Sequence, residues 1–164
     1  MQIQASDYWK LFKPSACSLK LKATGQDEVF EELVANFVRA KLLPAELEAA
    51  AVQAFKDRET LASTGVGNNV AIPHVKLKGI TEPLFSLALV PDGLEWKSVD
   101  GEPVKIFFAV LRPESANDQF DPERHLEMMR WISGLVREAD FRRFALAVTK
   151  RSELVDLLKE MSRQ

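Results

Sequence analysis

The fold is best read from one run of the sequence, Val104-Lys105-Ile106-Phe107-Phe108-Ala109-Val110-Leu111. It is short, dominated by β-branched and aromatic residues, and enclosed by prolines, as is typical of a buried or half-buried strand. The run Leu84 to Val90 has the same character and is also enclosed by prolines. Asp92-Gly93 and Asp100-Gly101 are expected to supply the turns between the two. The middle of the chain therefore predicts a β-sheet.

Helical patterns precede and follow these strands. Apolar residues recur at helical spacing from Asp27 to about Lys41, with acids in the first turns, where the helix dipole favours them. Pro44 is well placed as the first residue of a second helix that ends near Arg58. Three later helices are expected: one capped by Asp121 with Pro122 at its first position, one from Phe141 to Val148 and one from Ser152 to Met161.

Two shorter segments complete the expected layout. The alternation of Cys17, Leu19 and Leu21 with polar residues predicts a brief half-buried strand. The turn formers of Ser63 to Asn69 predict a surface loop before the short apolar stretch Val70 to Ile72. Helices on either side of the strands favour an α/β fold, with a single mixed β-sheet flanked by helices on both faces. Since no linker interrupts the pattern, residues 1–164 are expected to form one domain.

Composition excludes several classes of protein. The 164 residues are 46% hydrophobic and 28% charged, which suits one domain with a sizeable core and not a disordered chain. A net charge of −2 makes nucleic-acid binding unexpected. The single cysteine, Cys17, allows neither an internal disulfide nor a multi-thiolate zinc site. Because no run of about 18 apolar residues occurs, no membrane insertion is expected, and a cytoplasmic location is predicted.

The residues around His74 attract attention as a candidate site. Pro73 restricts Ile72 to extended geometry and fixes its own φ, which stiffens the approach to His74. A histidine held in this way can expose one ring nitrogen as a nucleophile while the other is hydrogen-bonded. Without its loop, the same histidine would be read as a surface or capping residue. The amides and hydroxyls of the preceding loop would face an incoming anion.

Other chemistries find little support in the sequence. The two histidines are neither paired on a helix nor close to another Cys or His in sequence, so no metal site is expected. No nucleophile-elbow serine is present, and Gly65-Val66-Gly67 lacks the third glycine of a dinucleotide fingerprint and the ending of a P-loop. No cofactor is therefore predicted.

Three motifs together resemble a known family: Arg58-Glu59, Ser63-Thr64-Gly65-Val66-Gly67-Asn68 and Ala71-Ile72-Pro73-His74. The chain resembles the enzyme IIA domain of the fructose/mannitol class of the phosphoenolpyruvate-dependent sugar phosphotransferase system (PTS). That class includes the nitrogen-regulatory enzyme IIA proteins. The resemblance continues through Val99 to Val104, Arg112-Pro113 and His125-Leu126.

The resemblance implies a phosphotransferase with a phosphohistidine intermediate. His74 would accept a phosphoryl group from the phosphocarrier HPr and pass it to an enzyme IIB protein, in sugar uptake or in a regulatory branch of the same cascade. His125 would hydrogen-bond the phosphoryl group and Arg58 would supply a positive charge near its oxygens. Ser63, Thr64 and Gly65 would line the pocket.

Alternatives stay open for these residues. His125, in the first turn of a helix, can instead face solvent, and Arg58 can instead form a surface pair with Glu59. The chain as a whole can be a regulatory module that selects target proteins by its phosphorylation state, or a binding domain that is never phosphorylated.

This sequence departs from the family pattern in three places. Asn69 stands where the family usually has a second loop glycine, and asparagine tolerates left-handed backbone, so we expect the turn to be kept. Val75 follows His74 where a small residue is common. The segment Glu114 to Glu123 is longer and more polar than usual before His125.

Overall fold

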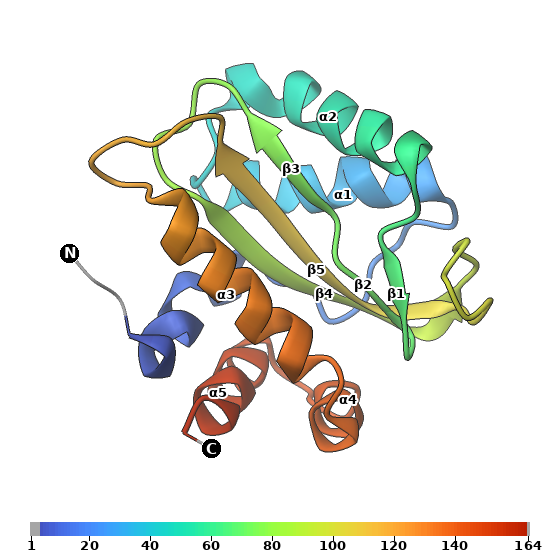
Figure 1. The fold of residues 1–164 in the computed structure, drawn as a ribbon. Coiled ribbons are helices and arrows are strands. Elements are labelled where there is room, and N and C mark those ends of the chain that lie inside the picture. Colours follow the sequence, from blue (N-terminus) through green and yellow to red (C-terminus); the bar gives the residue numbers. More distant parts are fainter. Residues whose placement is uncertain (1–3, 164) are drawn as a thin grey trace.

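A mixed β-sheet lies between two layers of helices in the computed structural model, which describes residues 4–163 (Figure 1). Helices α1 (Gln26–Arg39) and α2 (Glu48–Leu61) cover one face. Helices α3 (Pro122–Leu135), α4 (Ala139–Ala145) and α5 (Arg151–Met161) cover the other. The predicted fold class, a single mixed sheet with helices on both faces, is confirmed.

Strand β5 (Val104–Pro113) is the centre of the sheet. On one side it pairs antiparallel with β4 (Leu84–Leu94). On its other side it pairs in parallel with two short strands that follow one another along the chain, β2 (Val70–Ala71) and β3 (His74–Leu77). Strand β1 (Gly65–Gly67) pairs antiparallel with β2 and ends the sheet there.

The side chains of β5 divide between two cores, one on each face of the sheet. Phe107, Ala109 and Leu111 belong to the cluster under α1 and α2, and Ile106 and Phe108 to the cluster under the C-terminal helices. A strand covered on both faces has no polar side, which is why the run reads as almost continuously apolar.

Helix α2 begins slightly later than predicted, whereas α1 begins within one residue of the predicted Asp27. Between Pro44 and α2 the chain makes a short 3₁₀ turn, η3 (Ala45–Leu47). Pro44 has an extended ψ of 140° and therefore precedes the helical region instead of opening it. Phe30 of α1 and Phe55 of α2 stack with ring centroids 5.5 Å apart, which joins the two helices.

On the opposite face, the predicted start of α3 is confirmed. Pro122 occupies the first turn, and the Asp121 side chain accepts a hydrogen bond from the Glu123 N–H at 3.0 Å. Two 3₁₀ helices near the N-terminus, η1 (Ala5–Leu11) and η2 (Pro14–Ala16), pack beside α5. The two predicted C-terminal helices are present with slightly different bounds.

Two expectations about the strands are wrong. The segment from Cys17 to Leu21 is no strand: it bends after a single bridge between Ser18 and β4, although Leu21 also hydrogen-bonds to Leu89. Asp92-Gly93 forms no turn between strands, because β4 continues to Leu94. Gly93 has a φ of 82° and lies where the register between β4 and β5 shifts, between Leu89 and Leu94. Its positive φ therefore belongs to an irregularity within a strand and not to a turn.

The turn expected at Asp100-Gly101 is confirmed. Gly101 has a φ of 75° and its N–H donates to the Ser98 carbonyl at 3.1 Å. Within residues 4–163, no helix combines the length and apolar character needed to cross a membrane.

Candidate functional site

A tight hairpin leads the chain to His74. Strands β1 and β2 are joined by Asn68 and Asn69, which have φ values of 57° and 66°. A two-residue turn with both φ values positive matches the twist of the strands that it joins. The expectation that Asn69 keeps a left-handed turn is confirmed. The segment was predicted as a loop, and β1 was missed because three residues with two glycines carry no strand pattern.

Pro73 separates β2 from β3 and sets where His74 lies. The Pro73 carbonyl accepts a hydrogen bond from the Val110 N–H of β5 at 2.9 Å, and the Ile72 N–H donates to the Thr64 carbonyl at 2.9 Å. These bonds hold the backbone on both sides of the proline. His74 is consequently the first residue of β3 and is paired with Val110.

The side chain of His74 points toward α3. Val75 and Leu77 are buried in the core under α1 and α2, so their neighbours His74 and Lys76 face the other side of the sheet. On that side, His125 of the first turn of α3 meets His74. The two Nε2 atoms are 3.0 Å apart, although 51 residues separate the histidines in sequence.

His125 is fixed from several directions. It is 6% exposed, and the rings of Phe85 and Phe120 lie 5.9 and 5.3 Å from its own, centroid to centroid. Phe120 is the buried residue within the long polar segment Glu114 to Glu123, so the extra length of this segment is compatible with the contact between the histidines. The alternative that His125 faces solvent is wrong.

Both imidazoles are held neutral at physiological pH. Burial lowers the pKa of His74 to about 4, with further lowering by the positive charges of Arg112, Arg58 and Lys76. Burial also lowers the pKa of His125 to about 4, helped by His74 and Arg112. Because both rings are neutral, one Nε2 carries the shared proton and donates it to the lone pair of the other.

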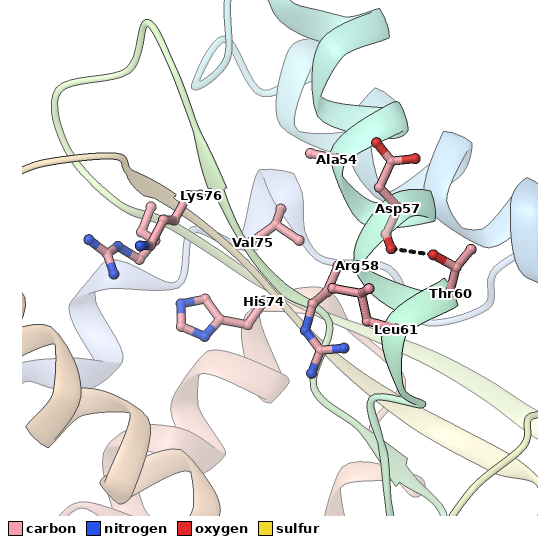
Figure 2. Close-up of a pocket in the computed structure, with 9 residues that line it drawn as sticks. Ala54, Asp57, Arg58, Thr60, Leu61, His74, Val75 and Lys76 are labelled. Carbon is pink, nitrogen blue, oxygen red and sulfur yellow. Dashed lines mark hydrogen bonds between the residues drawn. The ribbon is translucent and has the colours of Figure 1, made fainter.

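His74 also lines an open cavity of about 590 Å³ between β3 and the C-terminal end of α2. Figure 2 shows Arg58 reaching from α2 toward the same space as the His74 ring. The Arg58 Nη1–H group donates to the Ala62 carbonyl at 2.8 Å, which holds the guanidinium at the helix end. The cavity is lined by Ala54, Asp57, Arg58, Thr60, Leu61, His74, Val75, Lys76 and Arg112.

The structure thus brings together three of the six predicted site residues. His74 and Arg58 line one cavity, and His125 is hydrogen-bonded to His74. Ser63, Thr64 and Gly65 do not line that cavity. The Ser63 hydroxyl accepts from the Gly65 N–H at 3.1 Å. A pocket role for these three residues stays a prediction.

Thr64 instead belongs to a buried network around Glu59. The Glu59 carboxylate accepts hydrogen bonds from the Thr64 N–H at 2.8 Å, the Thr64 hydroxyl at 2.6 Å and the Trp96 indole N–H at 3.1 Å. The alternative of a surface pair between Arg58 and Glu59 is therefore wrong. Adjacent helical residues point in different directions, and Glu59 points inward.

Arg112 lines the cavity beside His74, and sequence reasoning assigned it no role. The family resemblance extends through Arg112-Pro113 without giving Arg112 a role, and period two in a strand places Arg112 on the same face as Val110. That β3 lies next to this part of β5 follows from the sheet topology alone. Within the described part of the chain, no three His, Cys, Asp or Glu side chains gather to hold a metal ion.

The sequence is similar to one protein family and to several known proteins. Residues 10–161 match the family described as "Phosphoenolpyruvate-dependent sugar phosphotransferase system, EIIA 2". The nitrogen regulatory protein of Pseudomonas aeruginosa is 33% identical over 134 residues, covering 81% of this chain and 82% of that protein. The PTS system fructose-specific EIIABC component of Bacillus subtilis is 26% identical over 151 residues, and the chain spans only 23% of its length.

Solved structures show the same fold. Nitrogen regulatory protein IIA-Ntr from Neisseria meningitidis superposes with a TM-score of 0.80 at 25% identity, covering 92% of this chain and 97% of that one. The Escherichia coli enzyme IIAMTL, solved in complex with phosphorylated enzyme IIBMTL, has a TM-score of 0.67 at 17% identity, covering 91% and 97%. With the family match extending over nearly the whole sequence, the chain belongs to the EIIA 2 family of the phosphoenolpyruvate-dependent sugar phosphotransferase system.

Proposed function

We propose that this protein is a phosphoryl carrier that is phosphorylated on His74. Its donor is an HPr-like phosphocarrier and its acceptor the thiol of an enzyme IIB. The observation that supports this most directly is the pairing of two neutral imidazoles, with Nε2 atoms 3.0 Å apart, beside a cavity that also holds Arg58. Membership of a phosphotransferase family agrees with it.

The neutral state of His74 supplies the nucleophile. In the reactive tautomer the His125 Nε2–H group donates to the His74 Nε2 lone pair, which keeps that nitrogen free of its own proton. When phosphorus approaches, the lone pair forms the new N–P bond while the bond from phosphorus to the donor breaks, and its electron pair leaves with the donor. His125 then redirects its N–H to a phosphoryl oxygen. No proton needs to be removed from His74.

Arg58 offsets the charge that arrives with the phosphoryl group. Phosphoryl transfer asks a protein mainly to position the reactants in line and to place positive charge near the equatorial oxygens. Arg58 has no carboxylate partner within ion-pair distance among residues 4–163, so its charge is available to the ligand. Transfer onward to an enzyme IIB reverses the same steps.

Two exposed leucines near the histidines support a protein partner. Leu61 lines the cavity and is 82% exposed, and Leu126, next to His125, is 51% exposed. Exposed apolar side chains around a reactive group suit the docking of a partner protein. The fold relative IIAMTL was solved with phosphorylated IIBMTL, which is why an enzyme IIB is proposed as the acceptor here.

A regulatory phospho-switch is the second candidate. The relatives named nitrogen regulatory protein from Pseudomonas aeruginosa and Bradyrhizobium diazoefficiens are 33% and 34% identical to this chain, and the match covers 82% and 80% of their lengths. In this role His74 is phosphorylated in the same way, but the two states of the surface select a target protein and no phosphate is passed onward. A cytoplasmic location suits both roles and stays a prediction.

Phosphorylation is tested by incubating the protein with phosphoenolpyruvate, enzyme I and HPr, followed by intact-mass measurement. Wild type is expected to gain one phosphoryl group, His74→Ala none, and His125→Ala one group more slowly. Phosphate on His74→Ala would contradict the assignment of the nucleophile. Absence of phosphate from wild type would favour the third reading, a binding domain that is never phosphorylated.

The two candidate roles separate in a second reaction. Purified phosphoprotein is mixed with fructose- and mannitol-type enzyme IIB domains, and the loss of phosphate from His74 is followed together with its appearance on the IIB thiol. Transfer supports the carrier role. A phosphoprotein that retains its phosphate in the presence of every such domain supports the switch.

A further inference from the structure

We infer that Arg112, near the end of β5, is a second phosphoryl-binding residue, which contacts the phosphoryl group on His74 from the sheet while Arg58 contacts it from α2. This inference rests on the proposed function and adds to it a residue that the sequence motifs around His74 do not include. Arg112 would bind the equatorial oxygens during transfer and the dianionic group afterwards.

The register of the sheet places Arg112 beside His74. In the parallel pairing of β3 with β5, His74 is opposite Val110 and Lys76 is opposite Arg112. Paired residues of parallel strands project to the same face, so Arg112 emerges on the face that carries His74. The cavity lined by His74 and Arg58 is lined by Arg112 as well.

The guanidinium of Arg112 is held in place by neutral groups. Its Nε–H donates to the Pro113 carbonyl at 3.0 Å, and its central carbon lies 4.8 Å from the centroid of the Phe120 ring. The Phe120 ring in turn lies edge-on to His125. A side chain with these contacts loses less conformational freedom when it binds an anion than a mobile surface arginine does.

The charge of Arg112 is not neutralised within the protein. No carboxylate lies within ion-pair distance of it among residues 4–163. Three cations, Arg58, Lys76 and Arg112, line the cavity against one acid, Asp57, which accepts a hydrogen bond from Gln53. An excess of positive charge around a neutral nucleophile matches a dianionic phosphoryl group.

The electrostatics of the histidines agree with this placement. Among the charges that lower the pKa of His74, Arg112 has the largest effect, followed by Arg58 and Lys76. Arg112 also lowers the pKa of His125. One guanidinium therefore acts on both rings of the pair, as a group beside the transferred phosphorus should.

The first test compares phosphorylation rates of the full-length protein with HPr as donor. Arg112→Met removes the charge but keeps an apolar side chain over Phe120, and Arg112→Lys keeps a charge without the planar fork. We expect Arg112→Met to slow transfer by about 10²-fold, as loss of one preorganised donor does, with Arg112→Lys between it and wild type. Arg143→Ala is the matched control, because Arg143 also packs on an aromatic ring, Phe144, but does not line the cavity.

The second test needs no phosphate. The pKa of His74 is measured by NMR titration of the unphosphorylated proteins. It should rise in Arg112→Met, rise less in Arg112→Lys and stay unchanged in Arg143→Ala. A structural role of Arg112 alone would slow transfer by lowering the folded fraction but would leave the pKa of His74 in the folded protein unchanged.

The outcomes separate the two proposals. If wild type is phosphorylated and Arg112→Met reacts at the same rate, this inference is overturned and the proposed function stands. An unchanged His74 pKa in Arg112→Met overturns it as well. If wild type takes no phosphate, the proposed function fails first and the inference falls with it.

Discussion

Glu59 offers a quantitative test of how the site is built. Its buried carboxylate, 9% exposed, accepts three hydrogen bonds, two from Thr64 and one from the Trp96 indole. It thereby joins the end of α2, which carries Arg58, to the chain entering β1. Trp96 packs in turn against Phe107 of β5, with ring centroids 5.0 Å apart. Removal of the carboxylate should loosen all three elements.

The loss in the free energy of unfolding can be estimated from the hydrogen-bond donors that are left without an acceptor. In Glu59→Ala the Thr64 N–H and the Trp96 indole N–H lose their acceptor and cannot turn toward another, whereas the Thr64 hydroxyl can rotate. A buried donor without a partner costs about 1–3 kcal/mol, so two of them predict a loss of roughly 2–6 kcal/mol in the free energy of unfolding. That is a large part of the ~5–15 kcal/mol of a typical domain.

Glu59→Gln should be much milder. Its carbonyl oxygen can accept the Thr64 N–H and the indole N–H, while its NH₂ group faces a hydroxyl that can turn to accept. We expect a loss of about 1 kcal/mol, the net worth of a weakened hydrogen bond. Glu31→Ala is the control, because it removes an exposed ion pair with Lys56 at 3.7 Å and should cost about 0–1 kcal/mol.

The assay is urea unfolding at pH 7, followed by far-UV circular dichroism and tryptophan fluorescence. The expected order of stability is wild type and Glu31→Ala, then Glu59→Gln, then Glu59→Ala. If Glu59→Ala loses less than about 1 kcal/mol, or if Glu59→Gln is as unstable as Glu59→Ala, the hydrogen bonds to Glu59 do not hold α2, Thr64 and Trp96 together.

Three further predictions concern the histidine pair and the chain around it. The pKa values of His74 and His125 are lowered to about 4 in the folded protein, so the unfolded chain binds more protons between pH 6.5 and 4. The free energy of unfolding should therefore fall as the pH drops through this window, by about 2–4 kcal/mol after allowance for solvent screening. Chemical unfolding at each pH measures it, and the fall should be smaller in the double variant His74→Gln/His125→Gln. Arg58→Ala should slow phosphorylation by HPr by about 10²-fold without changing the unfolding midpoint, and an unchanged rate in rapid-quench measurement would remove Arg58 from the site. Gly65→Ala should cost about 1–3 kcal/mol in urea unfolding, because its Cβ would lie 3.0 Å from the Ser98 Cα; no loss would mean that the Ser98 segment yields easily.

The main elements of the fold could be predicted because their signals are local. The run Val104 to Leu111 is apolar on both faces, and Asp121-Pro122 carries its own start signal for a helix. The errors occurred where the outcome depends on neighbours. The Cys17 to Leu21 segment alternates like a strand, yet only one bridge joins it to β4. Gly93 looks like a turn residue, yet it lies in a strand that continues.

The candidate site divides in a similar way. The loop before His74 and its resemblance to the EIIA family pointed to Arg58, His74 and His125 from sequence. Neither the loop nor the resemblance indicated where the side chains of Thr64 and Arg112 point. Thr64 bonds to the buried Glu59, and Arg112 lines the cavity beside His74.

The periodicity and turn chemistry of the chain were enough to establish the helices, the two long strands and the stiff approach to His74, because each depends on residues a few positions apart. The Nε2 atoms of His74 and His125 lie 3.0 Å apart, and Arg112 lies beside them. Both features depend on which strands pair and in what register. The register of these strands is set by the packing of both cores against β5, which involves many contacts between residues distant in sequence. For this reason His74 could be singled out in the sequence as the proposed nucleophile, whereas the groups that surround it became visible only in the folded chain.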